Sequence, residues 1–262
     1  DTDIASLDSV DECSLMLEKH RPDVVIHTAG LTDVDRCESS FDLAKEVNVD
    51  ITRNLAEACK NHSIKLVHIS TDHLFSGEQE FATEESSPKP LNTYAKTKLQ
   101  SEQEVQKKCK DSLVIRTNFF GWGPKYRQSF SDYILSNLRN NVSINLFSDV
   151  YFTPILIEEL SDRVHQLIDS NSSGVFNIVG GERLSKFEFG VKLAHYFNLD
   201  QGLINPISIN EIPSLVNRPK DMSLSNAKFC KKFNCNIINL DNQIQTFKRQ
   251  EEACAKNQVL LN

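Results

Sequence analysis

Residues 64–72 have the sequence Ile-Lys-Leu-Val-His-Ile-Ser-Thr-Asp, an apolar and β-branched run that ends in three polar side chains. Two further runs of this kind are DVVIHT at 23–28 and LVIR at 113–116. All three show little polar alternation, which is typical of strands buried on both faces of a parallel sheet. Ligands of such sheets bind at the carboxyl ends of the strands, so we expect the Ser-Thr-Asp at 70–72 to face a site.

Segments with helical periodicity lie between these strands. The alternation of strand and helix predicts an α/β fold with a doubly wound parallel sheet of Rossmann type. The chain after residue 179 is less regular and contains Pro206, Pro213 and Pro219. We therefore expect a Rossmann-type domain over 1–179 and a smaller substrate-binding lobe over 180–262, to which residues 118–154 contribute. Helices are predicted over 10–20, 44–61, 93–109, 130–140, 158–169 and 186–197, and further strands over 144–147 and 175–179.

The composition excludes several classes of protein. Hydrophobic residues make up 39% of the 262 residues, as in ordinary globular chains, which excludes wholesale disorder. The net charge of −7 argues against nucleic acid or an anionic membrane as the main partner, because both require a basic face. No apolar stretch is long enough to span a bilayer. Seven scattered cysteines without a CxxC pair predict reduced thiols in the cytoplasm, with no metal site.

One expected element is missing from the sequence. A dinucleotide site usually opens with a strand, a GxGxxG loop and a helix, and the nine glycines contain no such motif. The strand at 23–28 is apolar on both faces, so it should have neighbours on both sides. We therefore expect that a first strand, its glycine-rich loop and a helix precede Asp1, and that the predicted domain lacks this N-terminal βαβ unit. The alternative is a fold without them, which would leave a hydrophobic strand edge bare.

Tyr94 and Lys98 are the strongest catalytic candidates. Asn92 is a good helix N-cap, and the spacing of four residues places both side chains on one helix face. A nearby ammonium lowers the pKa of a phenol from about 10, which makes the phenol a usable general acid or base. Tyr–Lys pairs also occur by chance on helix surfaces. The Ser-Thr-Asp strand end upstream favours an active site, in which Thr71 would hold a substrate oxygen.

This combination resembles the extended short-chain dehydrogenase/reductase family. Within it, the chain is most similar to the dTDP-4-dehydrorhamnose reductases and related sugar-nucleotide-binding proteins. The resemblance covers nearly the whole chain and weakens after about residue 225. The matching stretches are 22–38, 47–48, 68–77, 90–98, 116–118, 174–178, 218–219 and 223–224.

The resemblance implies a role for each matching residue. Tyr94 would donate the proton to the carbonyl being reduced, and Lys98 would lower the pKa of Tyr94 and bind the nicotinamide ribose. Thr71 would hydrogen-bond the substrate oxygen. Asn48 matches a position that braces the site, although an ordinary polar helix residue would fit there as well. The cofactor contacts implied in this way are Asp3, Ile4, Ala29, Gly30, Thr32, Asn48, Tyr94 and Lys98.

The resemblance also implies a reaction. It indicates an NAD(P)-dependent enzyme that reduces a 4-keto-6-deoxy nucleotide sugar, as in dTDP-rhamnose biosynthesis, with NADP(H) favoured over NAD(H). A nucleotide-sugar epimerase is one alternative, whereas a dehydratase is disfavoured because Asp72-His73, rather than an acidic pair, follows Thr71. A second alternative is a non-catalytic, cofactor-binding regulatory subunit, because the beta subunit of methionine adenosyltransferase resembles the same family. A homodimer is left open.

Overall fold

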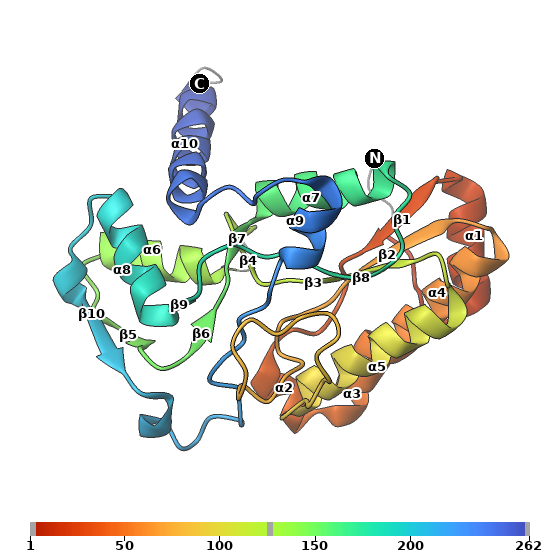
Figure 1. Ribbon diagram of the computed structural model, residues 1–262, viewed down its shortest axis with the longest axis horizontal. Coiled ribbons are helices and arrows are strands. Elements are labelled where there is room, and N and C mark those ends of the chain that lie inside the picture. Colours follow the sequence, from red (N-terminus) through yellow and green to blue (C-terminus); the bar gives the residue numbers. More distant parts are fainter. Residues whose placement is uncertain (1–3, 125–127, 260–262) are drawn as a thin grey trace.

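A four-stranded parallel sheet forms the centre of the larger part of the molecule (Figure 1). The computed structural model describes residues 4–124 and 128–259. The strand order is β1-β2-β3-β8, and all three pairings are parallel. This arrangement confirms the predicted α/β fold. The strands are β1 (Val24–His27), β2 (Lys65–Ile69), β3 (Leu113–Arg116) and β8 (Gly174–Asn177).

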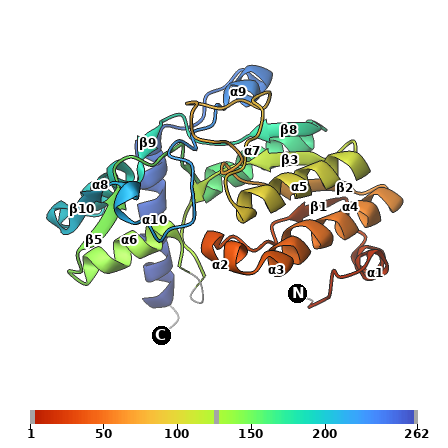
Figure 2. The same ribbon diagram turned by 90° about the horizontal axis from the view of Figure 1, so that it is seen from below.

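Helices cover both faces of this sheet (Figures 1 and 2). Leu66 and Val114 pack with α1 (Val10–His20), α4 (Ile51–Asn61) and α5 (Thr93–Lys108). The alternate strand residues Val67, Leu113 and Ile115 pack with α7 (Ile157–Asp169) and α9 (Ala227–Phe233). Successive side chains of a strand point to opposite faces, so a run without polar alternation is what this double cover requires.

Strand β1 lies at one edge of the sheet. It pairs with β2 in register from Val24 opposite Lys65 to His27 opposite His68. Within residues 4–124 and 128–259 it has no second strand partner, and Ile26 is 41% exposed. The loop after β1 leads into α2 (Val34–Ser39).

The helix predicted over 44–61 differs from the structure in one informative respect. The chain forms α3 (Phe41–Lys45), then a π-helical turn over Glu46–Asp50, and only then α4. The wider turn carries Asn48, which is 1% exposed and points into the protein. Such turns occur frequently at functional sites.

Within the described residues, the lobe is built from short strand pairs and three helices. The strand predicted over 144–147 is present and pairs in parallel with a later strand of the lobe. Prolines and short strands explain why the sequence showed little regularity here. The lobe pairs are β5 (Ile144–Phe147) with β10 (Ile204–Ile207), β6 (Tyr151–Phe152) with β9 (Leu184–Ser185), and β4 (Phe119–Phe120) with β7 (Ile155–Leu156), and its helices are α6 (Phe130–Arg139), α8 (Lys186–Tyr196) and α10 (Leu240–Val259).

Packing links the lobe to the sheet. Phe120, Phe189 and Phe247 belong to one apolar cluster of the lobe, whereas Phe229 and Ile237 pack against the sheet. The chain therefore returns to the sheet after residue 222 before it enters α10, and the division at residue 179 stays a prediction. Short 3-10 turns occur at Gln201–Leu203 and Ile209–Glu211. None of the helices in the described ranges is both long and apolar enough to cross a bilayer.

Candidate active site

The polar residues that follow β2 are buried at its carboxyl end. Thr71 is 4% exposed and Asp72 is 1% exposed. The backbone N–H of His73 donates to Thr71 Oγ1 over 3.3 Å, and Asn118 Nδ2 donates to Asp72 Oδ2 over 2.6 Å. These contacts fix the segment that was expected to face a ligand.

Helix α5 is anchored at its first turn. Asn92 caps it by accepting a hydrogen bond of 2.9 Å from the N–H of Ala95, as the sequence predicted. The Glu38 carboxylate accepts a second one, of 2.8 Å, from the N–H of Thr93. Asn92 Nδ2 also donates to the carbonyl of Asn217, which joins the start of the helix to the lobe segment. The residue directly after Thr93, Tyr94, is therefore held at a fixed position.

Lys98 lies one turn after Tyr94, with its ammonium directed at the end of β2. Nζ donates to the carbonyl of Ile69 over 2.8 Å and lies 3.3 Å from Nε2 of His68. Burial lowers the pKa of Lys98 to about 8, while the Glu102 carboxylate acts in the opposite direction. The third ammonium N–H has no partner among the described residues, so it can serve a ligand.

Tyr94 contacts the segment that follows Thr71. Its ring is 7% exposed and meets the His73 ring edge-on, with the centroids 5.5 Å apart. His73 is the residue whose N–H bonds Thr71. The structure therefore brings Thr71, Tyr94 and Lys98 to the same end of the sheet, as the catalytic interpretation requires.

A second buried histidine lies behind Lys98. The rings of His27 and His68 stack with centroids 5.4 Å apart, and His27 Nε2 lies 3.0 Å from Thr52 Oγ1. Burial, with a smaller contribution from the Lys98 charge, lowers the pKa of His27 to about 4. The same two causes, with His27 as a third, hold the pKa of His68 well below its usual value. Both rings are therefore neutral at pH 7.

Asn48 connects the loop after β1 to α5. Its Oδ1 accepts from the N–H of Leu31 over 2.8 Å, and its Nδ2 donates to Leu31 O and to Thr97 Oγ1. Thr97 Oγ1 in turn donates to the carbonyl of Tyr94. Asn48 thus braces the site from the neighbouring helix, and a direct cofactor contact stays a prediction.

Three of the remaining predicted cofactor residues lie in the loop after β1. Ala29 and Thr32 are exposed in the loop after β1, where an approaching ligand can reach them. A Cβ at Gly30 would lie 3.2 Å from Asn48 Oδ1, so this position favours glycine. Ile4 is fully exposed. Asp3 lies outside the described residues.

A cavity of about 540 Å³ adjoins the site on the lobe side. It lies between the loop at Gly77 and the segment that contains Arg218 and Lys220. Arg218 pairs with Asp35 at the start of α2, and Lys220 Nζ lies 3.0 Å from Asp149. Both cations that line this cavity are therefore already paired with carboxylates.

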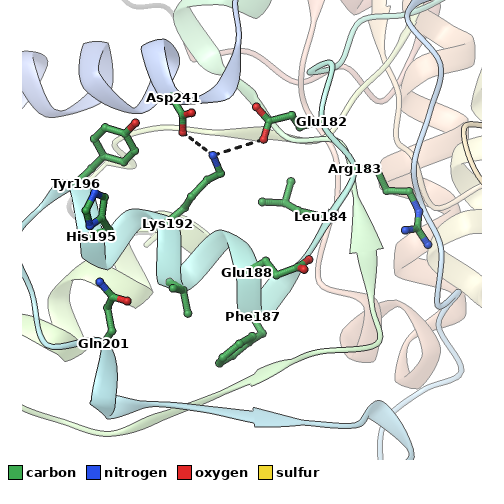
Figure 3. A pocket seen from close by; sticks show the side chains of 11 residues that line it. Glu182, Arg183, Leu184, Phe187, Glu188, Lys192, His195, Tyr196, Gln201 and Asp241 are labelled. Atoms are coloured by element: carbon green, nitrogen blue, oxygen red, sulfur yellow. Dashed lines mark hydrogen bonds and ion pairs between the residues drawn. The ribbon is translucent and has the colours of Figure 1, made fainter.

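Another cavity, of about 570 Å³, lies between α8 and the start of α10 (Figure 3). Lys192 occupies its centre and bonds Asp241 and Glu182. None of the predicted site residues lines it. No group of three or more metal-ligating side chains occurs in the part of the chain that the structure describes.

The chain is similar to known proteins over most of its length. A family model described as the RmlD substrate binding domain matches residues 1–252. The chain is 28% identical over 234 residues to a probable low-salt glycan biosynthesis reductase of Haloferax volcanii, over 87% of this chain and 78% of that protein. It is 29% identical over 220 residues to methionine adenosyltransferase 2 subunit beta of Rattus norvegicus, over 81% of this chain and 66% of that subunit.

A solved structure of the same fold is also similar to this chain. The dTDP-4-dehydrorhamnose reductase from Bacillus anthracis in complex with NADP superposes with a TM-score of 0.87 at 25% identity. The superposition covers 94% of this chain and 87% of that chain.

Proposed function

Because the chain belongs to the RmlD substrate binding domain family, we propose that it reduces a keto group on a nucleotide sugar with NAD(P)H. The proposed substrate class is a 4-keto-6-deoxy nucleotide sugar, with NADP(H) as the preferred cofactor. The observation that carries the proposal is the buried Lys98 ammonium, bonded to the Ile69 carbonyl one helical turn after Tyr94. This arrangement stands at the carboxyl end of β2, beside Thr71.

The residues present fit the nicotinamide-ribose end of the cofactor. Lys98 keeps one N–H without a partner among the described residues, and that N–H can meet a ribose hydroxyl. Gly30 and the exposed Ala29 and Thr32 offer a surface along the loop after β1. The 262 residues contain no GxGxxG loop for the pyrophosphate. When bound, the cofactor supplies a hydride to the keto carbon.

The side chains of this chain would handle the charge that then develops on the keto oxygen. Tyr94 donates its phenolic proton to that oxygen. Lys98 stabilises the tyrosinate left behind, because an opposite charge nearby favours the ionised phenol. Thr71 turns its hydroxyl proton from Asp72 Oδ1, 3.3 Å away, to donate a hydrogen bond to the same oxygen and share its charge. Burial of all three side chains strengthens these interactions, since water is excluded.

The test is NADPH oxidation by the purified protein with dTDP-4-dehydrorhamnose, the compound named by the structural neighbour, and with related nucleotide ketones. We expect oxidation that depends on the ketone. Isomerisation of a nucleotide sugar without net NADPH consumption would favour an epimerase instead.

A second candidate function has its own support. The similarity to methionine adenosyltransferase 2 subunit beta, at 29% identity, favours a cofactor-binding regulatory subunit. Its signature would be NADPH binding without turnover of any nucleotide ketone, together with a stoichiometric partner enzyme in a pull-down. Intact Thr71, Tyr94 and Lys98 are compatible with either function.

The cellular setting is also a proposal. All six cysteines with described side chains are free thiols, which favours a reducing compartment such as the cytoplasm. Homodimer formation stays a prediction, which gel filtration of the purified protein can test.

A further inference from the structure

Lys186, the first residue of α8, has an unusual position for a lysine. Lys186 is only partly exposed. Its Nζ lies 3.3 Å from the centroid of the Phe152 ring and 5.0 Å from that of the Phe130 ring. A cation at the first turn of a helix opposes the helix dipole. Taking an ammonium out of water is unfavourable unless it is paired. Both effects make the charged form of Lys186 unfavourable at this position in the folded protein.

The described residues satisfy only part of the bonding capacity of this ammonium. No hydrogen bond or ion pair joins Nζ to any residue in the described ranges, so the aromatic faces are its only direct partners there. Burial lowers the pKa of Lys186 to about 8, and Asp72 partly offsets this effect. At pH 7 the group is therefore a cation with N–H donors available to a ligand.

Asn118 connects the segment that carries Phe152 to the reacting end of the site: its side chain donates to Asp72 over 2.6 Å, and its carbonyl accepts from the N–H of Ile155, three residues after Phe152. Lys186 acts on Asp72 and on His73, the two residues directly after Thr71. His73 in turn contacts the Tyr94 ring. Lys186 thus belongs to the lobe and acts on the segment that carries the predicted catalytic threonine.

The opposite face of the same helix serves another role. Phe187, Val191 and Lys192 line the cavity of Figure 3, and Lys192 is held there by two carboxylates. Lys186 instead shares the inward face of α8 with the buried Phe189 and Gly190. The two lysines, six positions apart, provide a matched pair with different surroundings.

We propose that Lys186 is a specificity-determining residue whose ammonium donates hydrogen bonds to an oxygen substituent of the substrate's sugar. The inference rests on the proposed function, because it takes the ligand to be a nucleotide sugar. A sugar oxygen is favoured over a phosphate because the charge of Lys186 acts on Asp72, the residue directly after Thr71. Arg218 and Lys220 line the adjoining cavity, where a phosphate would compete with their partners Asp35 and Asp149.

The experiment compares Lys186→Met, Lys186→Arg and the control Lys192→Met. Calorimetry measures the binding of a dTDP-6-deoxy sugar, dTDP alone and NADPH, and steady-state kinetics measures KM and kcat with the corresponding ketone. We expect Lys186→Met to weaken sugar-nucleotide binding about tenfold or more, the effect of losing one charged hydrogen bond. Its binding of dTDP and NADPH should stay within about twofold. Lys186→Arg should recover most of the affinity, and Lys192→Met should resemble the wild type.

Several outcomes overturn the proposal. Unchanged sugar-nucleotide binding by Lys186→Met is one, and equal weakening for dTDP and the sugar nucleotide is another, since it would assign Lys186 to the phosphates. A melting temperature of Lys186→Met at or above that of the wild type verifies folding, because the variant removes a desolvated charge. If the wild type binds the sugar nucleotide but never reduces the ketone, the proposed reductase function is wrong. The role of Lys186 is then still tested by the calorimetric comparison of Lys186→Met with the wild type. Absence of any sugar-nucleotide binding by the wild type overturns both.

Discussion

Nζ of Lys98 lies 3.3 Å from Nε2 of His68, on the side of the lysine that faces the protein interior. The same nitrogen lies 2.9 Å from Ser101 Oγ, and the Ser101 hydroxyl donates to the Lys98 carbonyl. His68 Nδ1 has no hydrogen-bond partner within the described residues. The hydrogen bonding of His68 there is therefore directed at Lys98 and at the serine that bonds its backbone, which is the pattern of a positioning residue.

The first prediction tests this relationship. His68→Gln keeps an acceptor near the position of Nε2, whereas His68→Met has similar length and no comparable acceptor. We expect kcat/KM to fall about tenfold in His68→Met, roughly the value of one hydrogen bond to a charged group, and to stay within about threefold of wild type in His68→Gln. Because a purely structural role would affect both alike, equal losses measured in the two variants would contradict it.

The second prediction concerns the proton donor. Tyr94→Phe removes the phenol and keeps the ring that packs against His73. We expect kcat to fall by on the order of 10²-fold or more, because the lost interaction forms only in the transition state. NADPH affinity, measured by fluorescence titration, should change little. Turnover equal to that of wild type would rule out Tyr94 as the donor.

The third prediction concerns pH. The catalytic role needs Lys98 as an ammonium, and its pKa of about 8 means that the charge is lost above that pH. We expect kcat/KM to decline on the alkaline side with an apparent pKa near 8. Lys98→Arg stays charged, so its profile should lose this decline even though its absolute activity is lower. Lys98→Ala should weaken both turnover and NADPH binding. A Lys98→Arg profile with the same alkaline decline would assign that decline to another group.

The fourth prediction concerns acid stability. His27 is 4% exposed, and its pKa is lowered to about 4 in the folded protein. Between this pKa and the ordinary value near 6.5, the imidazole is therefore protonated in the unfolded chain but not in the folded one. Between pH 6.5 and about 4 the folded state therefore loses stability as the pH falls, by up to about 3 kcal/mol from this residue. His27→Gln keeps a donor toward Thr52 and should show a correspondingly weaker dependence in urea unfolding. Identical pH dependence in the two proteins would exclude His27 as a contributor.

The fifth prediction concerns the ion pair that joins α5 to β3. Arg116 Nε and Nη2 donate to the Glu102 carboxylate over 2.8 to 3.2 Å, and both side chains are nearly fully buried. Arg116→Met leaves a buried carboxylate unpaired, so we expect a loss of about 3–5 kcal/mol in the free energy of unfolding. Arg116→Met combined with Glu102→Gln should recover much of that loss. Additive losses in a double-mutant cycle would show that the pair is not coupled.

The sequence alone predicted the parallel strands at the centre of the fold and the helix that carries Tyr94 and Lys98. These features depend on local rules. Runs with little polar alternation such as 113–116 are typical of strands covered on both faces, and β3 is buried along its whole length. Asn92 caps α5 because its side chain reaches an N–H only three residues away. The spacing of four residues then fixes Tyr94 and Lys98 on one face whatever surrounds them.

Tertiary structure decided the rest, because the deciding contacts join residues far apart in the chain. The strand at 144–147 lies in the stretch 118–154 that was expected to contribute to the lobe, but nothing local identifies β10 as its partner. Nothing local marks Asn118 as the donor to Asp72, or His68 as the group behind Lys98. Lys186 has the sequence context of an exposed first-turn residue, and only the approach of Phe130 and Phe152 from other elements buries its ammonium. Local patterns fix which side chains share a face, whereas burial and charge come from packing between elements, which decides what those side chains can do.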